Sequence, residues 1–237
     1  MAVTAEARSL VKQSIANGEL VYLPDGTMLS VSGMGPRRAA LASRALLENG
    51  ATALLSWGCA GGLDPKLSPG SLILPKTVIT SNQILYHVDA TWHESLCNCL
   101  EGHVAFRTEP LVESTIAVRT PGEKVILFHE TGAIGVDMES AAVGAVAQET
   151  RAPFMVVRAV ADSADTTIPD STLNAIDEFG RLSLLKLIQG LAKDPTELFA
   201  LVRIALDYRA AQRTLAAVAR LTGKNLLVPQ GVIKELP

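Results

Sequence analysis

The chain has 237 residues, a formal net charge of -3 at pH 7 and no dense run of lysine or arginine. Sequence-independent binding of nucleic acid needs several clustered cations, so nucleic acid is not an expected partner. Hydrophobic residues make up 48% of the chain and charged residues 19%, which excludes extensive disorder and predicts one core built mainly from Ala, Val, Leu and Ile.

The three cysteines, Cys59, Cys97 and Cys99, form an odd set without CxxC spacing. This pattern predicts neither a disulfide framework nor a zinc site, and it favours a reducing cytoplasm. The N-terminus MAVTAEARSL has no positive leader followed by an apolar run, and no stretch reaches the roughly 18 apolar residues of a spanning helix. We therefore expect a soluble cytoplasmic protein without a transmembrane segment.

Short apolar runs alternate with helical patterns along most of the chain. Strands are predicted at 27–33, 51–58, 71–80 and 153–161, and helices at 36–49 and 138–149. Pro36 suits a first helical position and Gly50 a stop, so the boundaries of the first of these helices are well marked. Apolar strands separated by helices predict a single α/β domain with a largely parallel sheet between helices.

A further boundary falls at KDPTE, near the C-terminal end. Asp194 suits an N-cap, Pro195 the first helical position and Glu197 a capping-box acid. From Leu201 onward apolar residues recur at helical spacing until Gly223, which is typical of an amphipathic helix of about seven turns.

This predicted helix divides the chain into a main domain, residues 1–193, and a C-terminal helical extension and tail, residues 194–237. Packing on the core or on a partner subunit is its favoured role. The alternative is peripheral contact with a membrane surface, which the polar-face cations would suit: Arg203, Arg209, Arg213 and Arg220.

Residues that directly follow the apolar runs are the first candidates for a ligand site, because open α/β sheets bind ligands outside the carboxyl ends of their strands. Four places qualify: Glu6 after AVTA; Gly33 and Gly35 after TMLSV; Gly58 to Gly62 after ATALLSW; and Asp162, Ser163 and Asp165 after FMVVRAVA. The glycines before the helix at 36–49 could form an anion site or a plain tight turn. The second glycine segment, GCAGGLDP, is equally ambiguous by itself.

Acidic residues raise the same kind of alternative. Asp162, at the end of a very apolar strand, should be partly desolvated, which would raise its pKa and suit it to donate a proton; it could also merely cap a turn. Arg158, in the same strand, could pair with an acid. In GVDMESAAV, Asp137 and Glu139 stand where a helix N-terminus favours negative charge, so helix physics alone could explain them.

Taken together, SGMGPRRAA, GCAGGL, GVDMESAA and VVRAVADSAD resemble the signature segments of the purine nucleoside phosphorylase and methylthioadenosine/S-adenosylhomocysteine nucleosidase superfamily, over roughly residues 3–190. The GGLDP and VDMES sequences are most similar to those of hopanoid-associated phosphorylases, which act on a 5′-extended adenosine carrying a hopane tail. The resemblance implies a twisted mixed central β-sheet flanked by helices, a small-molecule nucleoside substrate, a homo-oligomer, and neither a metal nor an organic cofactor.

The resemblance also implies roles for single residues. Met138 would pack on the ribose, and Glu139 would accept hydrogen bonds from its 2′ and 3′ hydroxyls. Asp162 would bind purine N7 and protonate the departing base, with Gly61 and Ser163 in the base pocket. Glu6 would orient an attacking water.

The attacking group is left open. Phosphorolysis, the first expectation, would place phosphate at Gly35 and the following helix, near Arg37, Arg38 and Cys59. However, Ser56 stands where many phosphorylases of the superfamily carry Arg, and Cys59 stands where relatives usually have Ser or Thr. Hydrolysis is therefore one alternative, and a nucleoside-binding protein without turnover is another.

The segment YHVDATWHE falls where members of the superfamily line the pocket with a mobile segment. Tyr86, His87 and Trp92 are therefore candidates for substrate contact, and ordinary loop residues are the alternative.

Overall fold

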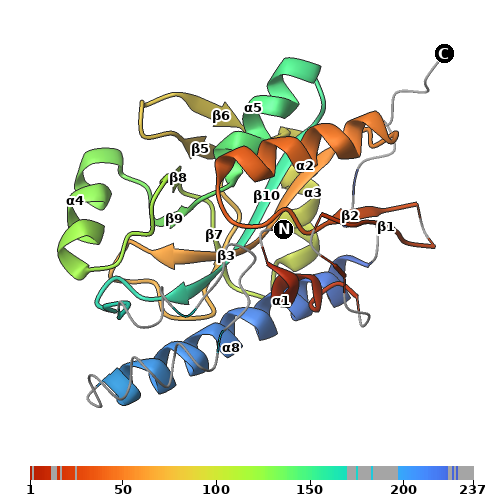
Figure 1. Cartoon of the computed structure of the whole chain (residues 1–237). Helices are drawn as coiled ribbons and strands as arrows, with labels where there is room; N and C mark the ends of the chain where they lie inside the picture. Colours follow the sequence, from red (N-terminus) through yellow and green to blue (C-terminus); the bar gives the residue numbers. More distant parts are fainter. Residues whose placement is uncertain are drawn as a thin grey trace.

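The computed structural model describes residues 1, 3–11, 15–16, 18–24, 26–169, 175, 183, 197–223, 226 and 228. An eight-stranded mixed sheet forms its centre (Figure 1). In spatial order its strands are β6 (Leu85–His87), β5 (Thr77–Ile79), β8 (Leu111–Glu113), β9 (Gly135–Asp137), β3 (Leu54–Gly62), β10 (Phe154–Asp162), β4 (Leu72–Ile73) and β7 (Phe106–Arg107). The predicted α/β class with a mixed sheet flanked by helices is confirmed.

The two long central strands, β3 and β10, decide where the site lies. They run parallel, with Leu54 opposite Phe154 at one end and Gly61 opposite Asp162 at the other. Their apolar side chains are almost all buried, as expected of strands covered on both faces. Parallel pairing brings their carboxyl ends to one edge of the sheet, so the glycine segment and the residues around Asp162 lie side by side.

Two strand predictions need correction. The run at 51–58 begins and ends later, because the glycines of GCAGG form the end of β3 rather than a loop; their backbone pairs with β10 on one side and β9 on the other. The run at 71–80 splits into β4 and β5 around Pro75. A proline has no N–H to donate to a neighbouring strand. The partner strand also changes at this point, because β4 pairs with β10 whereas β5 pairs with β8.

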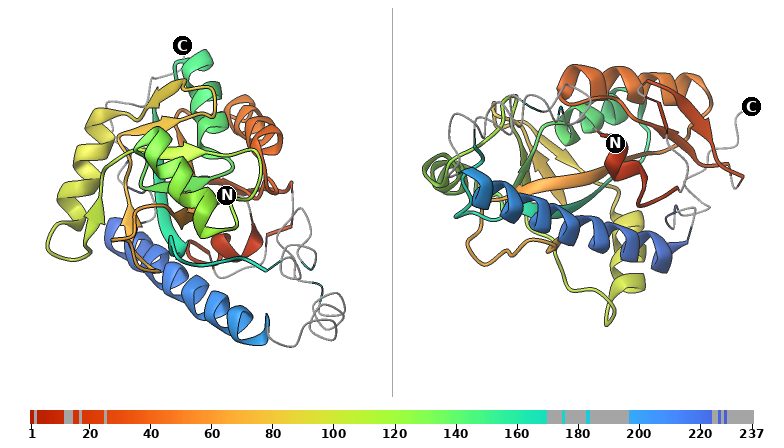
Figure 2. Two further views of the ribbon diagram at one scale, coloured as in Figure 1. Left: turned by 90° about the vertical axis from the view of Figure 1, so that its left-hand side faces the viewer. Right: turned by 60° about the horizontal axis from the view of Figure 1, so that its bottom comes forward.

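Helices cover both faces of the sheet (Figures 1 and 2). Helices α2 (Pro36–Glu48) and α5 (Ser140–Thr150) pack against each other on one side, and α8 (Glu197–Thr222) runs along β10 on the opposite side. The predicted C-terminal helix is thus confirmed, as is its end at Gly223, which has a positive φ of 72°. The predicted cap Asp194 and first helical residue Pro195 lie outside the described residues, and the domain division stays a prediction.

The N-terminal segment differs from its prediction. Glu6 does not follow a strand: Thr4–Ala7 form the short helix α1, and Glu6 is its third residue. A separate antiparallel pair, β1 (Leu20–Tyr22) and β2 (Met28–Ser30), follows. Two more helices, α3 (Ala90–Leu100) and α4 (Pro121–Thr131), complete the described elements.

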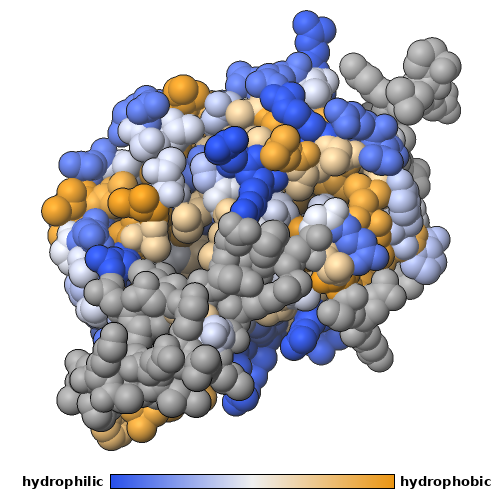
Figure 3. All heavy atoms as spheres, in the orientation of Figure 1, coloured by the Kyte–Doolittle hydropathy of each residue, from blue (hydrophilic) through white to orange (hydrophobic). Residues whose placement is uncertain are grey.

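None of the helices in the described part of the chain is long and apolar enough to cross a membrane. On the face shown in Figure 3, apolar side chains form small patches between polar ones. Peripheral contact through α8 stays a prediction. Large apolar side chains are exposed on the first turns of that helix: Leu198, Phe199, Val202 and Leu206.

Candidate active site

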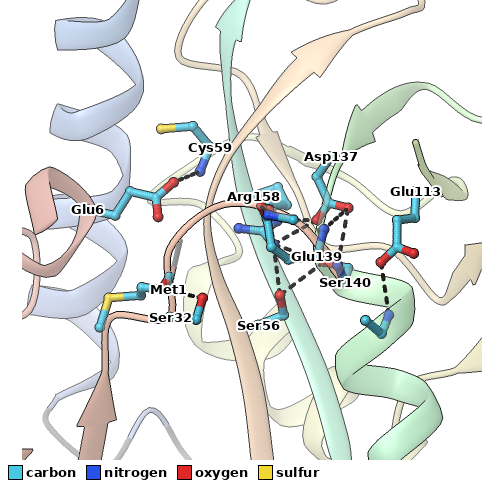
Figure 4. A network of polar contacts seen from close by, with 12 residues as sticks. Met1, Glu6, Ser32, Ser56, Cys59, Glu113, Asp137, Glu139, Ser140 and Arg158 are labelled. Carbon is cyan, nitrogen blue, oxygen red and sulfur yellow. Dashed lines mark hydrogen bonds and ion pairs between the residues drawn. The ribbon is translucent and has the colours of Figure 1, made fainter. Parts of the chain in front are cut away.

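Arg158, in the middle of β10, is the centre of the polar network in Figure 4, although it is only 1% exposed. Its Nε donates to Asp137 Oδ2 at 2.7 Å. Its Nη2 donates to the hydroxyls of Ser56 at 2.7 Å and Ser140 at 3.0 Å. Burial alone would lower the pKa of Arg158, but the surrounding carboxylates, Asp137 foremost, raise it above its ordinary value. The suggestion that Arg158 pairs with an acid is therefore confirmed.

The remaining nitrogen of this guanidinium is the unusual feature. Nη1 of Arg158 is buried and has no hydrogen-bond partner in the described part of the chain. An unpaired buried donor costs about 1–3 kcal/mol, and more when it is charged, so buried donors are normally satisfied by protein, water or ligand. The orphan N–H therefore indicates a binding position for a small polar molecule.

Glu6 flanks the same position from α1. Its Oε2 accepts the backbone N–H of Val3 at 3.2 Å, and its Oε1 accepts that of Cys59 at 2.8 Å. Gly58 makes this approach possible: a Cβ built there would lie 2.3 Å from Glu6 Oε1 and 2.5 Å from Arg158 Nη1. In Figure 4, Glu6 lies on one side of Arg158 and Asp137 on the other. The Glu6 carboxylate and the unpaired Nη1 of Arg158 thus both lie beside Gly58.

Glu139, the second acid of VDMES, belongs to the same cluster. Its Oε1 accepts the backbone N–H of Gly35 at 2.9 Å, and its Oε2 lies 3.9 Å from Arg158 Nη2. Burial, and next the Asp137 carboxylate, raise the pKa of Glu139 to about 7. Met138 beside it is half-buried. Glu139, one of the two residues predicted to contact ribose, therefore lies beside Arg158 in the middle of β10.

Asp137 has a structural task in this cluster. Its Oδ1 accepts the backbone N–H groups of Glu139 at 3.3 Å and Ser140 at 3.2 Å, which starts α5 in the way expected of an acid at a helix N-terminus. Its Oδ2 binds Arg158 and the Ser140 hydroxyl. Asp137 therefore orients the arginine.

Asp162 ends β10 and has a side chain that is 14% exposed. The carboxylate lies against Gly61, where a Cβ would be 3.3 Å from Asp162 Oδ2. Its Oδ2 is 2.5 Å from Lys124 Nζ, yet burial still raises the pKa of Asp162 above its ordinary value.

The structure also places the other candidates, Cys59, Ser163, Arg37 and Arg38. Burial raises the pKa of the Cys59 thiol well above its ordinary value, which makes it a poor nucleophile. Ser163 donates from its hydroxyl to Asp165 at 2.5 Å and so stabilises the turn after β10. On α2, Arg37 is exposed and Arg38 half-buried.

The segment at 86–94 is not brought to this cluster. Trp92 is 2% exposed in the hydrophobic core, where its Nε1 donates to the carbonyl of Leu226 at 2.9 Å. It belongs to α3, a regular helix that the side chain of Asp89 caps. Tyr86 and His87 lie on β6 and line a separate hollow of about 430 Å³ beside the C-terminal end of α5.

The sequence did not predict two buried charged residues, Lys124 and Glu113. Lys124 is 0% exposed. The only sign of it in the sequence is the helix start TPGE, because Lys124 directly follows this capping segment in the first turns of α4. Glu113 lies opposite Asp137 in the sheet, accepts the backbone N–H of Ala142 at 2.9 Å, and has its pKa raised by burial to about 7. No local pattern in the sequence marks that residue.

Comparison with known proteins finds nucleosidases among the relatives of this chain. The 5′-methylthioadenosine/S-adenosylhomocysteine nucleosidase of Buchnera aphidicola is 24% identical over 189 residues, which is 70% of this chain and 75% of that protein. The protein of the same description from Treponema pallidum is 27% identical over 173 residues, which is 56% of this chain and 64% of that one.

Solved structures share the fold. The same type of nucleosidase from Neisseria meningitidis, in complex with methylthio-immucillin-A, has a TM-score of 0.69 at 19% identity, with 94% of this chain and 96% of that chain covered. Futalosine hydrolase of Helicobacter pylori has a TM-score of 0.63 at 17% identity, with 92% and 94% covered.

The predicted class, an enzyme acting on an N-ribosyl bond, is confirmed at the level of the family. Residues 22–189 match the Phosphorylase superfamily. These residues are more than half of the chain, which therefore belongs to the Phosphorylase superfamily.

Proposed function

We propose that this protein is a hydrolytic nucleosidase that cleaves the N-ribosyl bond of a 5′-substituted adenosine and releases adenine. One observation carries the choice of water over phosphate. Two backbone N–H groups at the predicted phosphate position already bind the chain's own carboxylates: Gly35 N–H binds Glu139, and Cys59 N–H binds Glu6. A phosphate would displace these bonds and would face two like charges, whereas a water can donate to a carboxylate and accept from Arg158 Nη1.

The reaction follows from these positions. The C1′–N9 bond breaks with its electron pair moving to the base, and Asp162 gives a proton to N7, so that adenine leaves as a neutral molecule. The Glu139 carboxylate would favour positive charge growing on the ribose ring. Water between Glu6 and Arg158 forms the new O–C1′ bond and gives its proton to Glu6. Exchange with solvent then restores both carboxyl groups.

The names of the relatives support the substrate class. Methylthioadenosine and S-adenosylhomocysteine, for which the two nucleosidases are named, share an adenosine with a sulfur-linked 5′ group. We take both as first substrates. A third substrate, an adenosine with a long apolar 5′ group, tests the hopanoid-associated prediction, which rests on the sequences GGLDP and VDMES alone.

The deciding experiment measures adenine release from these three kinds of substrate with and without phosphate, and follows the sugar product by phosphorus NMR. We expect equal rates in both buffers and no sugar 1-phosphate. Glu6→Gln should slow the reaction by about 10²–10⁴-fold, the usual loss of a general base. Glu48→Gln, an exposed residue of α2, is the matched control and should behave as wild type. Phosphate-dependent release with a sugar 1-phosphate product would refute hydrolysis.

A further inference from the structure

Lys124 reaches the site because of how α4 begins. The hydroxyl of Thr120 accepts the backbone N–H of Glu123 at 3.2 Å, and Glu123 Oε2 accepts that of Thr120 at 2.9 Å. This reciprocal cap, with Pro121 at the first helical position, sets the register of the helix. In that register Glu123 is exposed, whereas the next residue, Lys124, is fully buried.

The ammonium of Lys124 is held by three acceptors. Nζ donates to Asp162 Oδ2 at 2.5 Å, to the carbonyl of Ser163 at 2.7 Å and to that of Thr166 at 3.2 Å. A lysine ammonium has three protons, so all of its donors are used. The two carbonyls fix the ammonium to the turn that follows β10, and the fixed ammonium then fixes one oxygen of the carboxylate.

Charged groups from two elements act on Asp162. Burial raises its pKa, Lys124 on α4 lowers it, and Asp207 on α8 raises it. Cys59 on β3 is a third titratable group nearby, and burial raises the pKa of its thiol. Asp207 is itself 17% exposed and lies 3.8 Å from Arg203. A buried carboxyl without a cation would hold its proton too tightly to give it up at neutral pH, so the balance between these charges bears on catalysis.

We infer that Lys124 is a positioning residue for the reaction: it anchors Asp162 Oδ2 and leaves Oδ1 to meet the purine. The inference rests on the proposed function for its catalytic meaning. The ion pair and its effect on Asp162 can be tested without turnover.

The test follows the titration of Asp162 in the free protein by carbon NMR of carboxyl-labelled aspartate, with the resonance assigned by its absence in Asp162→Asn. Lys124→Met removes the cation and should raise the pKa of Asp162 by about one to three units, the usual effect of a close opposite charge. Asp207→Asn removes an anion and should lower that pKa. Glu130→Gln, an exposed charge change on α4, is the control and should leave it unmoved.

The same shifts should appear in activity. The descending limb of kcat against pH should move to higher pH in Lys124→Met and to lower pH in Asp207→Asn, whereas a lysine that only stabilises the fold would lower kcat without moving the limb. Should Lys124→Met fail to fold, nitrogen NMR of labelled lysine in the wild-type protein replaces it. One Nζ resonance should then shift at the pH where Asp162 titrates, and this step should vanish in Asp162→Asn.

The inference is overturned if Lys124→Met leaves the titration of Asp162 unmoved, or if no lysine resonance follows that titration. Adenine release by the wild-type protein decides the proposed function separately. The two ideas can therefore fail independently.

Discussion

Replacing Gly58 by alanine tests the approach of Glu6 to Arg158 most directly. The added Cβ would lie 2.3 Å from Glu6 Oε1, more than 1 Å inside an ordinary contact of about 3.5 Å. Arg158 cannot yield, because Asp137, Ser56 and Ser140 hold it. Glu6 must therefore retreat by about 1 Å and lose its bond to the Cys59 N–H. A misplacement of this size costs about 100-fold in rate.

The assay is adenine release under saturating substrate, together with thermal unfolding. For Gly58→Ala we expect kcat to fall about 100-fold and the free energy of unfolding to fall by about 1–3 kcal/mol, the usual cost of overpacking. Gly122→Ala is the matched control, since Gly122 is exposed on α4 and a Cβ there meets nothing within 4 Å. A folded Gly58→Ala protein with wild-type kcat would refute the idea that Glu6 must sit against the strand to act.

Three further predictions concern charge. Burial raises the pKa of Glu113 from 4.5 to about 7, so its protonated form favours folding and that stability is lost as pH rises between these values. Glu113→Gln should therefore raise the free energy of unfolding by about 1–3 kcal/mol above pH 7 and have little effect at low pH; an equal effect in denaturant titrations at both pH values would contradict this. Glu139→Gln should weaken ribose recognition and reduce kcat/KM at least about 10-fold, and unchanged kinetics would leave Glu139 as a helix-start charge. The Arg44–Glu149 pair, 2.6 Å apart but with side chains 47% and 57% exposed, should contribute under about 1 kcal/mol, so Arg44→Ala should barely change the melting temperature, and a large drop would refute this.

Local signals in the sequence predicted much of the architecture. Pro36 and Gly50 mark the limits of α2, Gly223 marks the end of α8, and the apolar runs predicted both central strands. Such signals act through contacts within one turn or one strand, which is why they can be read without a tertiary structure. The same holds for the acids of VDMES, whose place at a helix start is confirmed by the backbone N–H groups that Asp137 accepts.

Tertiary pairing decided the remainder. Whether GCAGG is a loop or a strand depends on the backbone of β10 and β9, and whether Trp92 faces a ligand or the core depends on how α3 packs. The resemblance assigned roles to Glu6 and Asp162. It did not predict that Glu6 binds the N–H of Cys59 or that Asp162 binds Lys124, because these partners are distant in the sequence.

The sequence by itself determined the alternation of strands and helices and the residues at their ends, because those preferences are local. Only the tertiary structure decided that Arg158 Nη1 lies beside Glu6 without a hydrogen-bond partner among the described residues, and that Lys124 binds Asp162 across 38 positions of the chain. The physical reason is that a charge is buried only where several distant elements supply its partners together, and those partners are set by packing.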